Sequence, residues 1–250
     1  SVGERSDTEE FVFRLYRTAE EVGLPVVAEP LSNPAEVAER VSYYNADPHT
    51  KGIVVAYPLV NFEPIDGESP KERFLREREA TNKIFNSIDY FKNHDGLGTD
   101  PRLPSATAEA CIELALAATP NLRNIGKAIV IRGSTGNVGR GVVKIAEQQG
   151  IPYIAIDHKT PPIAAREAVQ GAQTIITATG KAELLTLDDV GTRLTEKVLI
   201  DPGKGRNKAG DNVGDAHPEV QAAVREQGGF YGDASAIGKI ASPTILRRLV

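Results

Sequence analysis

Apolar residues in the second half of the chain fall in short runs, and each run is separated from the next by a segment with helical spacing. The runs lie at 128–131, 153–156, 174–177 and 198–200, with a further short run at 230–231. Runs this short, bounded by turn residues, are typical of buried strands. Because strands that alternate with helices form parallel sheets covered on both faces, the pattern predicts an α/β fold with a Rossmann-type doubly wound parallel sheet.

The first half of the chain is richer in charged residues and less regular. Apolar spacing and helix-start signals, such as Asn33 before Pro34, predict helices. Helices are predicted at 9–22, 34–45, 68–88 and 104–118, short strands at 25–28 and 52–57, a loop at 92–97, and a last helix at 242–250. We therefore expect two α/β lobes with a cleft. The first is a substrate or catalytic domain, 1–106 plus the C-terminal helix 238–250, and the second a dinucleotide-binding domain, 107–237.

Composition narrows the classes of function. The net charge of −5 gives no general attraction to nucleic acid, and no run is long enough to cross a membrane. The only cysteine, Cys111, lies in an amphipathic stretch, where we expect it to be buried, and no metal site is predicted. A cytoplasmic protein is the expectation. The chain contains no Met and opens on Ser1-Val-Gly3, which reads as the end of a strand, so we expect a missing N-terminal segment.

The most informative motif is the glycine series Gly133, Gly136 and Gly139, which follows the first run and opens a helix. Asp157 follows the next run. This order sets a dinucleotide pyrophosphate on a helix N-terminus and a ribose against a carboxylate. The spacing Gly-x-x-Gly-x-x-Gly is not the commonest one, and an ordinary strand-to-helix turn remains the alternative. The predicted cofactor-binding residues of the turn are Gly133, Ser134, Thr135, Gly136, Asn137, Val138 and Gly139.

Asp157 bears on the choice of cofactor. A carboxylate at this position accepts hydrogen bonds from ribose hydroxyls and repels a 2′-phosphate, so it favours NAD over NADP. His158 and Lys159 follow directly, and Lys159 has the length to reach a phosphate. A solvated acid at the end of a strand is the other interpretation.

Several segments together resemble the bifunctional methylenetetrahydrofolate dehydrogenase/cyclohydrolases. The stretch from Asn45-Ala-Asp-Pro48 to Tyr57-Pro-Leu59 is similar to a family signature, and Gly238 matches one glycine of a family loop. The other matching segments, in order and spacing, are 94–97, 133–139, 177–180, 200–203 and 213–215. The resemblance implies two α/β lobes, with folate in the cleft and the nicotinamide facing it.

The departures from the family concern the chemistry of the substrate side. Phe11 and Leu15 stand where the family has the Tyr and Lys of Tyr-x-x-x-Lys, and Ala56 replaces its Gln. Ser134 replaces the arginine that family members place on the NADP 2′-phosphate. Hydrolysis of a methenyl group needs an activated water and proton transfer, which Leu15 cannot supply. The segments 104–107 and 234–239 also differ from the family.

The resemblance further implies that Asp95 binds the amino-pyrimidine edge of a pterin, as a carboxylate accepting two N–H donors. A turn Asp before Gly96 is the alternative. Tyr57 either stacks on a flat ligand or is buried at a strand end, and Thr8 lies near the cleft or caps a helix. Thr179, Gly180 and Gly238 are expected near the cofactor.

Three functional hypotheses follow. The first is an NAD-dependent methylenetetrahydrofolate dehydrogenase without cyclohydrolase activity. The second is a dehydrogenase of the same fold for another small molecule. The third is a catalytically inactive nucleotide-binding homologue. The resemblance implies a homodimer.

Overall fold

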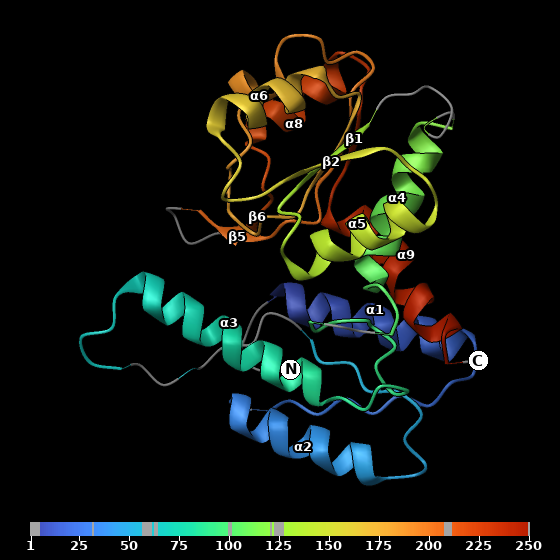
Figure 1. Cartoon of the computed structure of the whole chain (residues 1–250). Coiled ribbons are helices and arrows are strands. Elements are labelled where there is room, and N and C mark those ends of the chain that lie inside the picture. Colours follow the sequence, from blue (N-terminus) through green and yellow to red (C-terminus); the bar gives the residue numbers. More distant parts are fainter. Residues whose placement is uncertain are drawn as a thin grey trace. The chain divides into compact units, whose positions relative to one another are not determined.

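The computed structural model describes residues 6–31, 33–56, 62, 65–99, 102–120, 122, 128–207 and 212–249. The chain divides into two compact units. One comprises Ser1–Ala106 with Ser242–Val250, and the other comprises Thr107–Ala241 (Figure 1). In the part of the chain that is described, no helix has both the length and the apolar character needed to cross a membrane.

The second unit is built on a five-stranded, all-parallel sheet with the order β2-β1-β3-β4-β7. The strands are β1 (Ile129–Arg132), β2 (Tyr153–Ile156), β3 (Thr174–Thr177), β4 (Val198–Ile200) and β7 (Phe230–Gly232). The bounds of β2, β3 and β4 match the prediction. Strand β1 begins and ends one residue later than predicted, and β7 is one residue longer. The α/β class and the Rossmann-type sheet are therefore confirmed.

The helices of this unit reach both faces of the sheet because the strand order reverses at β1. The chain leaves β1 through α5 (Asn137–Gln148) to β2, then returns past β1 through α6 (Pro162–Gly171) to β3. Right-handed crossovers in opposite directions place α5 and α6 on opposite faces, as Figure 1 shows. The strands β3 and β4 are buried throughout, whereas the edge strand β2 exposes Ile154 and Ala155.

The remaining elements of the second unit are short or terminal. The helices are α4 (Ala106–Ala118), α7 (Leu187–Val190), α8 (Pro218–Glu226) and α9 (Ala234–Arg247). Two strands of two residues each, β5 (Gly205–Arg206) and β6 (Asn212–Val213), pair as an antiparallel hairpin. The sequence did not predict α7 or the hairpin, because elements this short carry no hydrophobic periodicity.

The last helix is longer than predicted. α9 begins at Ala234 rather than at 238 or 242, and its last residues, from Ser242 on, belong to the first unit. The segment 234–239, expected as an altered loop, is therefore helical, and Gly238 lies within the helix. Helix α4 likewise begins at Ala106, two residues after the predicted start.

The first unit consists of helices packed on extended segments. The helices are α1 (Ser6–Glu21), α2 (Pro34–Ala46) and α3 (Pro70–Ser87), and its apolar core includes Val37, Val41, Ile53, Ile84, Phe85 and Ile88. The predicted strands at 25–28 and 52–57 are wrong where the residues are described, since 24–30 and 51–56 form no strand. Ile53 is buried, and its backbone N–H bonds the Lys92 carbonyl at 2.9 Å. The apolar run at 52–56 therefore reports burial against α2 and α3 and not strand pairing.

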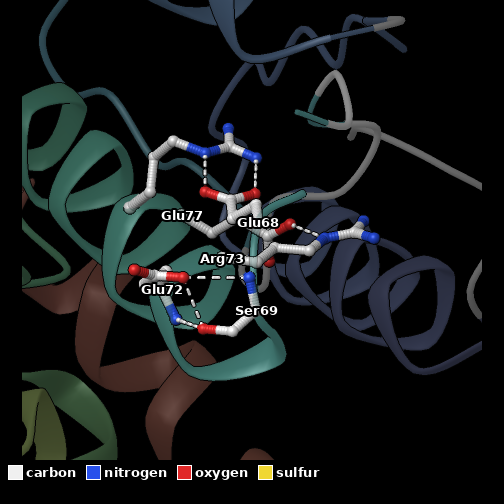
Figure 2. Close-up of polar contacts among 6 residues, drawn as sticks. Glu68, Ser69, Glu72, Arg73 and Glu77 are labelled. Atoms are coloured by element: carbon white, nitrogen blue, oxygen red, sulfur yellow. Dashed lines mark hydrogen bonds and ion pairs between the residues drawn. The ribbon is translucent and has the colours of Figure 1, made fainter. Parts of the chain in front are cut away.

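The N-terminus of α3 is held by a polar network (Figure 2). Ser69 Oγ accepts a bond from the Glu72 N–H at 3.3 Å, and Glu72 Oε2 accepts one from the Ser69 N–H at 2.9 Å, which forms a capping box. Arg76 makes a bidentate pair with Glu68, with contacts of 2.7 and 2.8 Å. Arg73 bonds Glu77 one turn further along the helix.

Two lysines close helix C-termini. The Nζ of Lys92 donates to the carbonyls of Tyr44, Asn45 and Asp47 at the end of α2, each at 2.8 Å. The Nζ of Lys197, which is 6% exposed, donates to the carbonyls of Val169, Gln170 and Ala172 at the end of α6. Carbonyls at a helix end lack intrahelical partners, so each ammonium stabilises a helix terminus and its negative dipole end.

Candidate functional sites

The glycine turn between β1 and α5 is closed to any side chain at two positions. A Cβ on Gly133, whose φ is +83°, would lie 2.5 Å from the Ala178 carbonyl oxygen. A Cβ on Gly139 would lie 2.1 Å from the Gly133 carbonyl oxygen. Both residues let two backbone segments approach each other, as the first turn of a nucleotide-binding sheet requires.

The N-terminus of α5 is open. Its N-cap residue is Gly136, which is exposed and offers no side-chain cap to the first turn. Thr135 is exposed, and Ser134, Asn137 and Val138 are half-buried around it. Uncapped N–H groups at the positive end of a helix dipole fit an anionic group such as a pyrophosphate. The residues present therefore suit a dinucleotide.

The turn and the end of β2 are joined directly. The backbone N–H groups of Gly133 and Ser134 both donate to the Ile156 carbonyl, at 2.9 and 3.2 Å, and Ser134 Oγ donates to it at 3.3 Å. Asp157 follows Ile156. The structure thus brings Ser134 and Asp157 together, which their separation in the sequence alone does not guarantee.

Asp157 is an ionised carboxylate that shapes its own turn. Its Oδ1 accepts a bond from the Lys159 N–H at 2.8 Å, and this bond is the main cause of a lowered pKa. The backbone N–H of Asp157 donates to Thr160 Oγ1 at 3.1 Å. The turn-forming role and the ribose-binding role use the same charged side chain, so the geometry is compatible with both.

The loop after β3 packs on the glycine turn. Thr179 lies in this loop, and Gly180 beside it has a φ of +65°. The side chain of Thr179 is already engaged, since its Oγ1 donates to Asp215 Oδ2 at 2.7 Å. Its backbone N–H donates to the same oxygen at 2.5 Å.

Sequence reasoning placed two buried carboxylates beside this loop in family-matching segments but assigned them no role. Asp201 follows β4 and Asp215 follows β6, and they are 1% and 0% exposed. Burial raises the pKa of Asp201 to about 6, and burial also raises the pKa of Asp215. The available signal for Asp201 was an acid placed directly after a fully apolar run, Val198 to Ile200.

In the first unit, Asp95 is a half-buried carboxylate without a hydrogen-bond donor among the described residues. Burial raises its pKa to about 6, and the charge of Arg248 opposes that rise. Such a group is poised to accept N–H donors from a ligand.

The loop that carries Asp95 is firmly fixed. Asn93 Oδ1 accepts a bond from the Gly96 N–H at 2.9 Å, and Asn93 Nδ2 donates to the Leu97 carbonyl at 2.8 Å. Arg248 donates to the carbonyls of His94 and Pro104, at 2.5 and 2.9 Å. Hydrogen bonds on both sides of Asp95 therefore hold its backbone in place.

His94 lies in the loop, as predicted, and its side chain is buried. Its Nε2 lies 3.1 Å from the Lys51 carbonyl oxygen, and burial lowers its pKa, so the imidazole is neutral near pH 7. The imidazole packs the loop against Lys51 and Gly52, whereas Gly96 faces the backbone of Leu103 and Pro104.

Phe11 and Leu15 lie one turn apart on α1. Phe11 is half-buried, Leu15 is 8% exposed, and Ala56 is half-buried at the end of an extended segment. Helix α1 begins at Ser6, so Thr8 is not an N-cap, and that alternative is wrong. The side chain of Thr8 and the whole of Tyr57 lie outside the described residues. Among the described residues, no three His, Cys, Asp or Glu side chains cluster as a metal site would require.

Comparison with known proteins identifies the family. Residues 105–247 match the family described as "Tetrahydrofolate dehydrogenase/cyclohydrolase, NAD(P)-binding domain". The chain belongs to the tetrahydrofolate dehydrogenase/cyclohydrolase family. This family assignment, made from the sequence as a resemblance, is confirmed.

Curated relatives of this family include the bifunctional protein FolD of Cupriavidus necator, which is 29% identical over 199 residues, and that of Deinococcus radiodurans, which is 28% identical over 208 residues. These matches cover 78% and 82% of this chain. The chain spans 63% and 64% of the length of these relatives.

Solved structures of the family share the fold. The bifunctional FolD enzyme of Campylobacter jejuni superposes with a TM-score of 0.69 at 22% identity, over 99% of this chain and 84% of that one. The NAD-dependent 5,10-methylenetetrahydrofolate dehydrogenase of Saccharomyces cerevisiae gives a TM-score of 0.69 at 13% identity, over 99% and 83%. At these identities the likeness shows the fold of this chain.

Proposed function

We propose that this protein is an NAD-dependent methylenetetrahydrofolate dehydrogenase that lacks cyclohydrolase activity. The observation that carries the proposal is the glycine turn, with its uncapped α5 N-terminus, in a chain of the tetrahydrofolate dehydrogenase/cyclohydrolase family. Curated relatives are named bifunctional FolD proteins, and a structural neighbour is named an NAD-dependent methylenetetrahydrofolate dehydrogenase.

In the second unit, the backbone N–H groups at the start of α5 hold the pyrophosphate, and Asp157 accepts the hydroxyls of the adenosine ribose. When bound, the nicotinamide ring supplies the hydride acceptor of the reaction. Thr179 and Gly180 line the same edge of the sheet, next to the glycine turn. The protein's own contribution is to orient the dinucleotide and to exclude the 2′-phosphate.

The preference for NAD rests on two positions. Ser134 offers no cation to a 2′-phosphate, and Asp157 repels one, since its lowered pKa keeps it ionised near neutral pH. The hydrogen bonds of Gly133 and Ser134 to the Ile156 carbonyl hold Ser134 next to the residue that precedes Asp157, which supports this proposal. A single change at either position should therefore shift the preference less than a change at both.

In the first unit, Asp95 binds the folate. A neutral or ionised carboxyl with open acceptor positions pairs with the amino-pyrimidine edge of a pterin. Leu15 and Ala56 carry no group that activates water or transfers a proton, so the hydrolytic step is absent. Hydride transfer needs only that the two carbons are held close and aligned.

A spectrophotometric assay at saturating methylenetetrahydrofolate tests the activity. We expect formation of reduced cofactor with NAD, a kcat/KM for NADP lower by a factor of about ten or more, and no hydrolysis of the methenyl product. The absence of reduced cofactor with both dinucleotides would refute the proposal.

The cofactor preference is tested with the double variant S134R/D157N. Adding a cation and removing a repelling charge should shift the ratio of kcat/KM values toward NADP by about tenfold to a hundredfold. Asp188→Asn is the control, because it removes one charge from an exposed acid of α7 in the same unit. If the ratio of kcat/KM values is unchanged in S134R/D157N, Ser134 and Asp157 do not determine the cofactor preference.

A second candidate is a dehydrogenase of the same fold for another small molecule. Leu15 and Ala56 favour it, because two polar positions of the family are apolar here. In that case NAD would raise the melting temperature and folate would not.

A homodimer is a further proposal, which the resemblance to the family implies. Light scattering on the purified protein tests it.

A further inference from the structure

A pair of buried aspartates ties together the loops at the carboxyl end of the sheet in the second unit. Asp215 Oδ2 accepts three hydrogen bonds from the end of β3 and the loop that follows. The donors are Thr177 Oγ1 at 2.9 Å, Thr179 Oγ1 at 2.7 Å and the Thr179 N–H at 2.5 Å. This one oxygen fixes the direction in which the chain leaves β3.

Asp201 holds Asp215 in turn. Its Oδ1 accepts from the N–H groups of Gly203 and Asp215, at 3.0 and 3.1 Å. Its Oδ2 accepts from the Ala216 N–H and the Tyr231 hydroxyl, each at 3.0 Å. The strands β3, β4 and β7 are thereby linked, through two carboxylates, to the segment after β6.

The backbone beside the two aspartates packs so closely that no side chain fits at two glycines. A Cβ on Gly203 would lie 2.1 Å from Asp215 Oδ1, and a Cβ on Gly214 would lie 2.3 Å from Asp201 Oδ2. The loop held by Asp215 is also the loop against which the glycine turn packs, since a Cβ on Gly133 would lie 2.5 Å from the Ala178 oxygen and 2.9 Å from the Thr179 nitrogen. The position of Asp215 is thus transmitted through Ala178 and Thr179 to the glycine turn.

Stability does not explain this pair. Asp215 Oδ1 is buried and has no hydrogen-bond partner in the part of the chain that the structure describes. A buried acceptor without a donor costs free energy, and two buried carboxylates repel each other. These costs accompany a hydrogen-bond network that fixes three loops, as expected at a site where geometry matters.

We propose that Asp201 and Asp215 are positioning residues for the dinucleotide, which hold the loop after β3 against the glycine turn so that the turn keeps its binding geometry. The inference rests on the proposed function, because it assumes that the turn binds NAD. Neither carboxylate touches the cofactor in this proposal, since both are buried beneath the loops they hold.

The test compares two threonines on one strand. Thr177, at the carboxyl end of β3, donates to Asp215, whereas Thr174, at the amino end, lies 3.4 Å from Thr119 Oγ1. Both are 1% exposed, so valine at either position removes one buried hydroxyl from the same strand. The measurement is the Kd for NAD by calorimetry, together with the melting temperature of each variant.

We expect Thr177→Val to raise the Kd for NAD by about tenfold or more, because a bond to a carboxylate is lost. Thr174→Val should leave the Kd within about twofold of wild type, even if both variants melt at a similarly lower temperature. Thr177→Ser, which keeps the hydroxyl, should bind NAD with an affinity close to that of wild type. Asp215→Asn, if it folds, should weaken binding more than Thr177→Val.

Equal Kd values for NAD in wild type and Thr177→Val would overturn the inference and leave the proposed function standing. Equal losses in Thr177→Val and Thr174→Val would also overturn it, since binding would then follow general stability. If wild type binds neither NAD nor NADP, the proposed function fails first, and this inference fails with it.

Discussion

Asp95 in the first unit and Asp201 in the second are carboxylates with raised pKa values but opposite surroundings. Burial raises both to about 6. Four donors bond the Asp201 carboxylate, whereas no donor from the described residues reaches that of Asp95. The comparison teaches that a raised pKa marks burial of a carboxylate, and that the hydrogen-bond partners decide whether the buried carboxylate holds the surrounding loops or is open to a ligand.

The same contrast separates the two units. In the second, the candidate site is made mainly of backbone, through a glycine turn and a helix N-terminus. In the first, it depends on one side chain on a loop, held by Asn93 and Arg248. Substitutions in the glycine turn of the second unit should therefore block binding sterically. A substitution of Asp95 in the first unit should remove a single interaction with the ligand.

The largest effect is expected at Gly139. In Gly139→Ala the new methyl would meet the Gly133 backbone oxygen at 2.1 Å, and backbone cannot move aside cheaply. We expect loss of measurable NAD binding and a lower melting temperature. Gly171→Ala is the matched control, because a Cβ there meets nothing within 4 Å and its stability should be unchanged or higher. Normal NAD binding by Gly139→Ala would show that the turn is not the site.

Asp95→Asn should lower kcat/KM for methylenetetrahydrofolate by about tenfold to a hundredfold, because an amide replaces one acceptor by a donor. The affinity for NAD should stay the same. Asp47→Asn is the control, since Asp47 is a turn residue of the same unit whose Oδ1 accepts from the His49 N–H at 3.0 Å. Identical kinetics for the two variants would make Asp95 a turn residue only.

Stability should rise as the pH is lowered from 7 toward about 4.5. A carboxyl with a raised pKa stabilises the fold fully below its unfolded pKa, and this contribution is lost as the pH rises through the folded value. For Asp201, a rise from 3.8 to about 6 corresponds to about 3 kcal/mol. The midpoint of urea unfolding, measured between pH 4 and 8, checks the slope.

Below about pH 4.5 the slope should reverse. The hydrogen bond of Arg40 lowers the pKa of Glu29 to about 2, and that of Ser69 lowers the pKa of Glu72. The contribution of such groups is present above their unfolded pKa and is lost as the pH falls through the folded value.

Asp95→Asn should flatten the dependence of stability on pH between pH 4.5 and 7. A slope equal to that of wild type would mean that Asp95 is well solvated.

The smallest effect is expected at the polar network of Figure 2. Ser69→Ala removes the N-cap of α3 and should cost about 1 kcal/mol of unfolding free energy. Arg73→Ala breaks an exposed ion pair with Glu77 and should cost less than about 0.5 kcal/mol. Neither variant should change kcat/KM. A larger loss from Arg73→Ala than from Ser69→Ala would contradict this order.

The fold of the second unit was predictable because its strands and helices are encoded by local patterns that repeat along the sequence. Each buried strand is an apolar run, each helix has its own period, and the turn between β1 and α5 needs glycine at fixed positions. The apolar runs therefore predicted β2, β3 and β4 with their observed bounds. The sequence also indicated Asp157 at the end of β2, although the contacts between Ile156 and Ser134 needed the fold.

The first unit was predictable only in its helices. The runs at 25–28 and 52–56 have the composition of strands, but an apolar run reports burial whether or not another strand pairs with it. Asp201 and Asp215 were assigned no role because their partners, Thr177, Thr179 and Tyr231, come from distant parts of the sequence. No local pattern encodes that meeting.

Lys92 and Lys197, which close α2 and α6, have a consequence for chemical labelling. Each ammonium is engaged by three carbonyl oxygens, so an amine-reactive reagent should modify exposed lysines such as Lys83 and Lys159 first. Mass spectrometry of partly labelled protein would then follow the opening of one helix end in each unit separately. The two lysines therefore report local unfolding without an engineered labelling site.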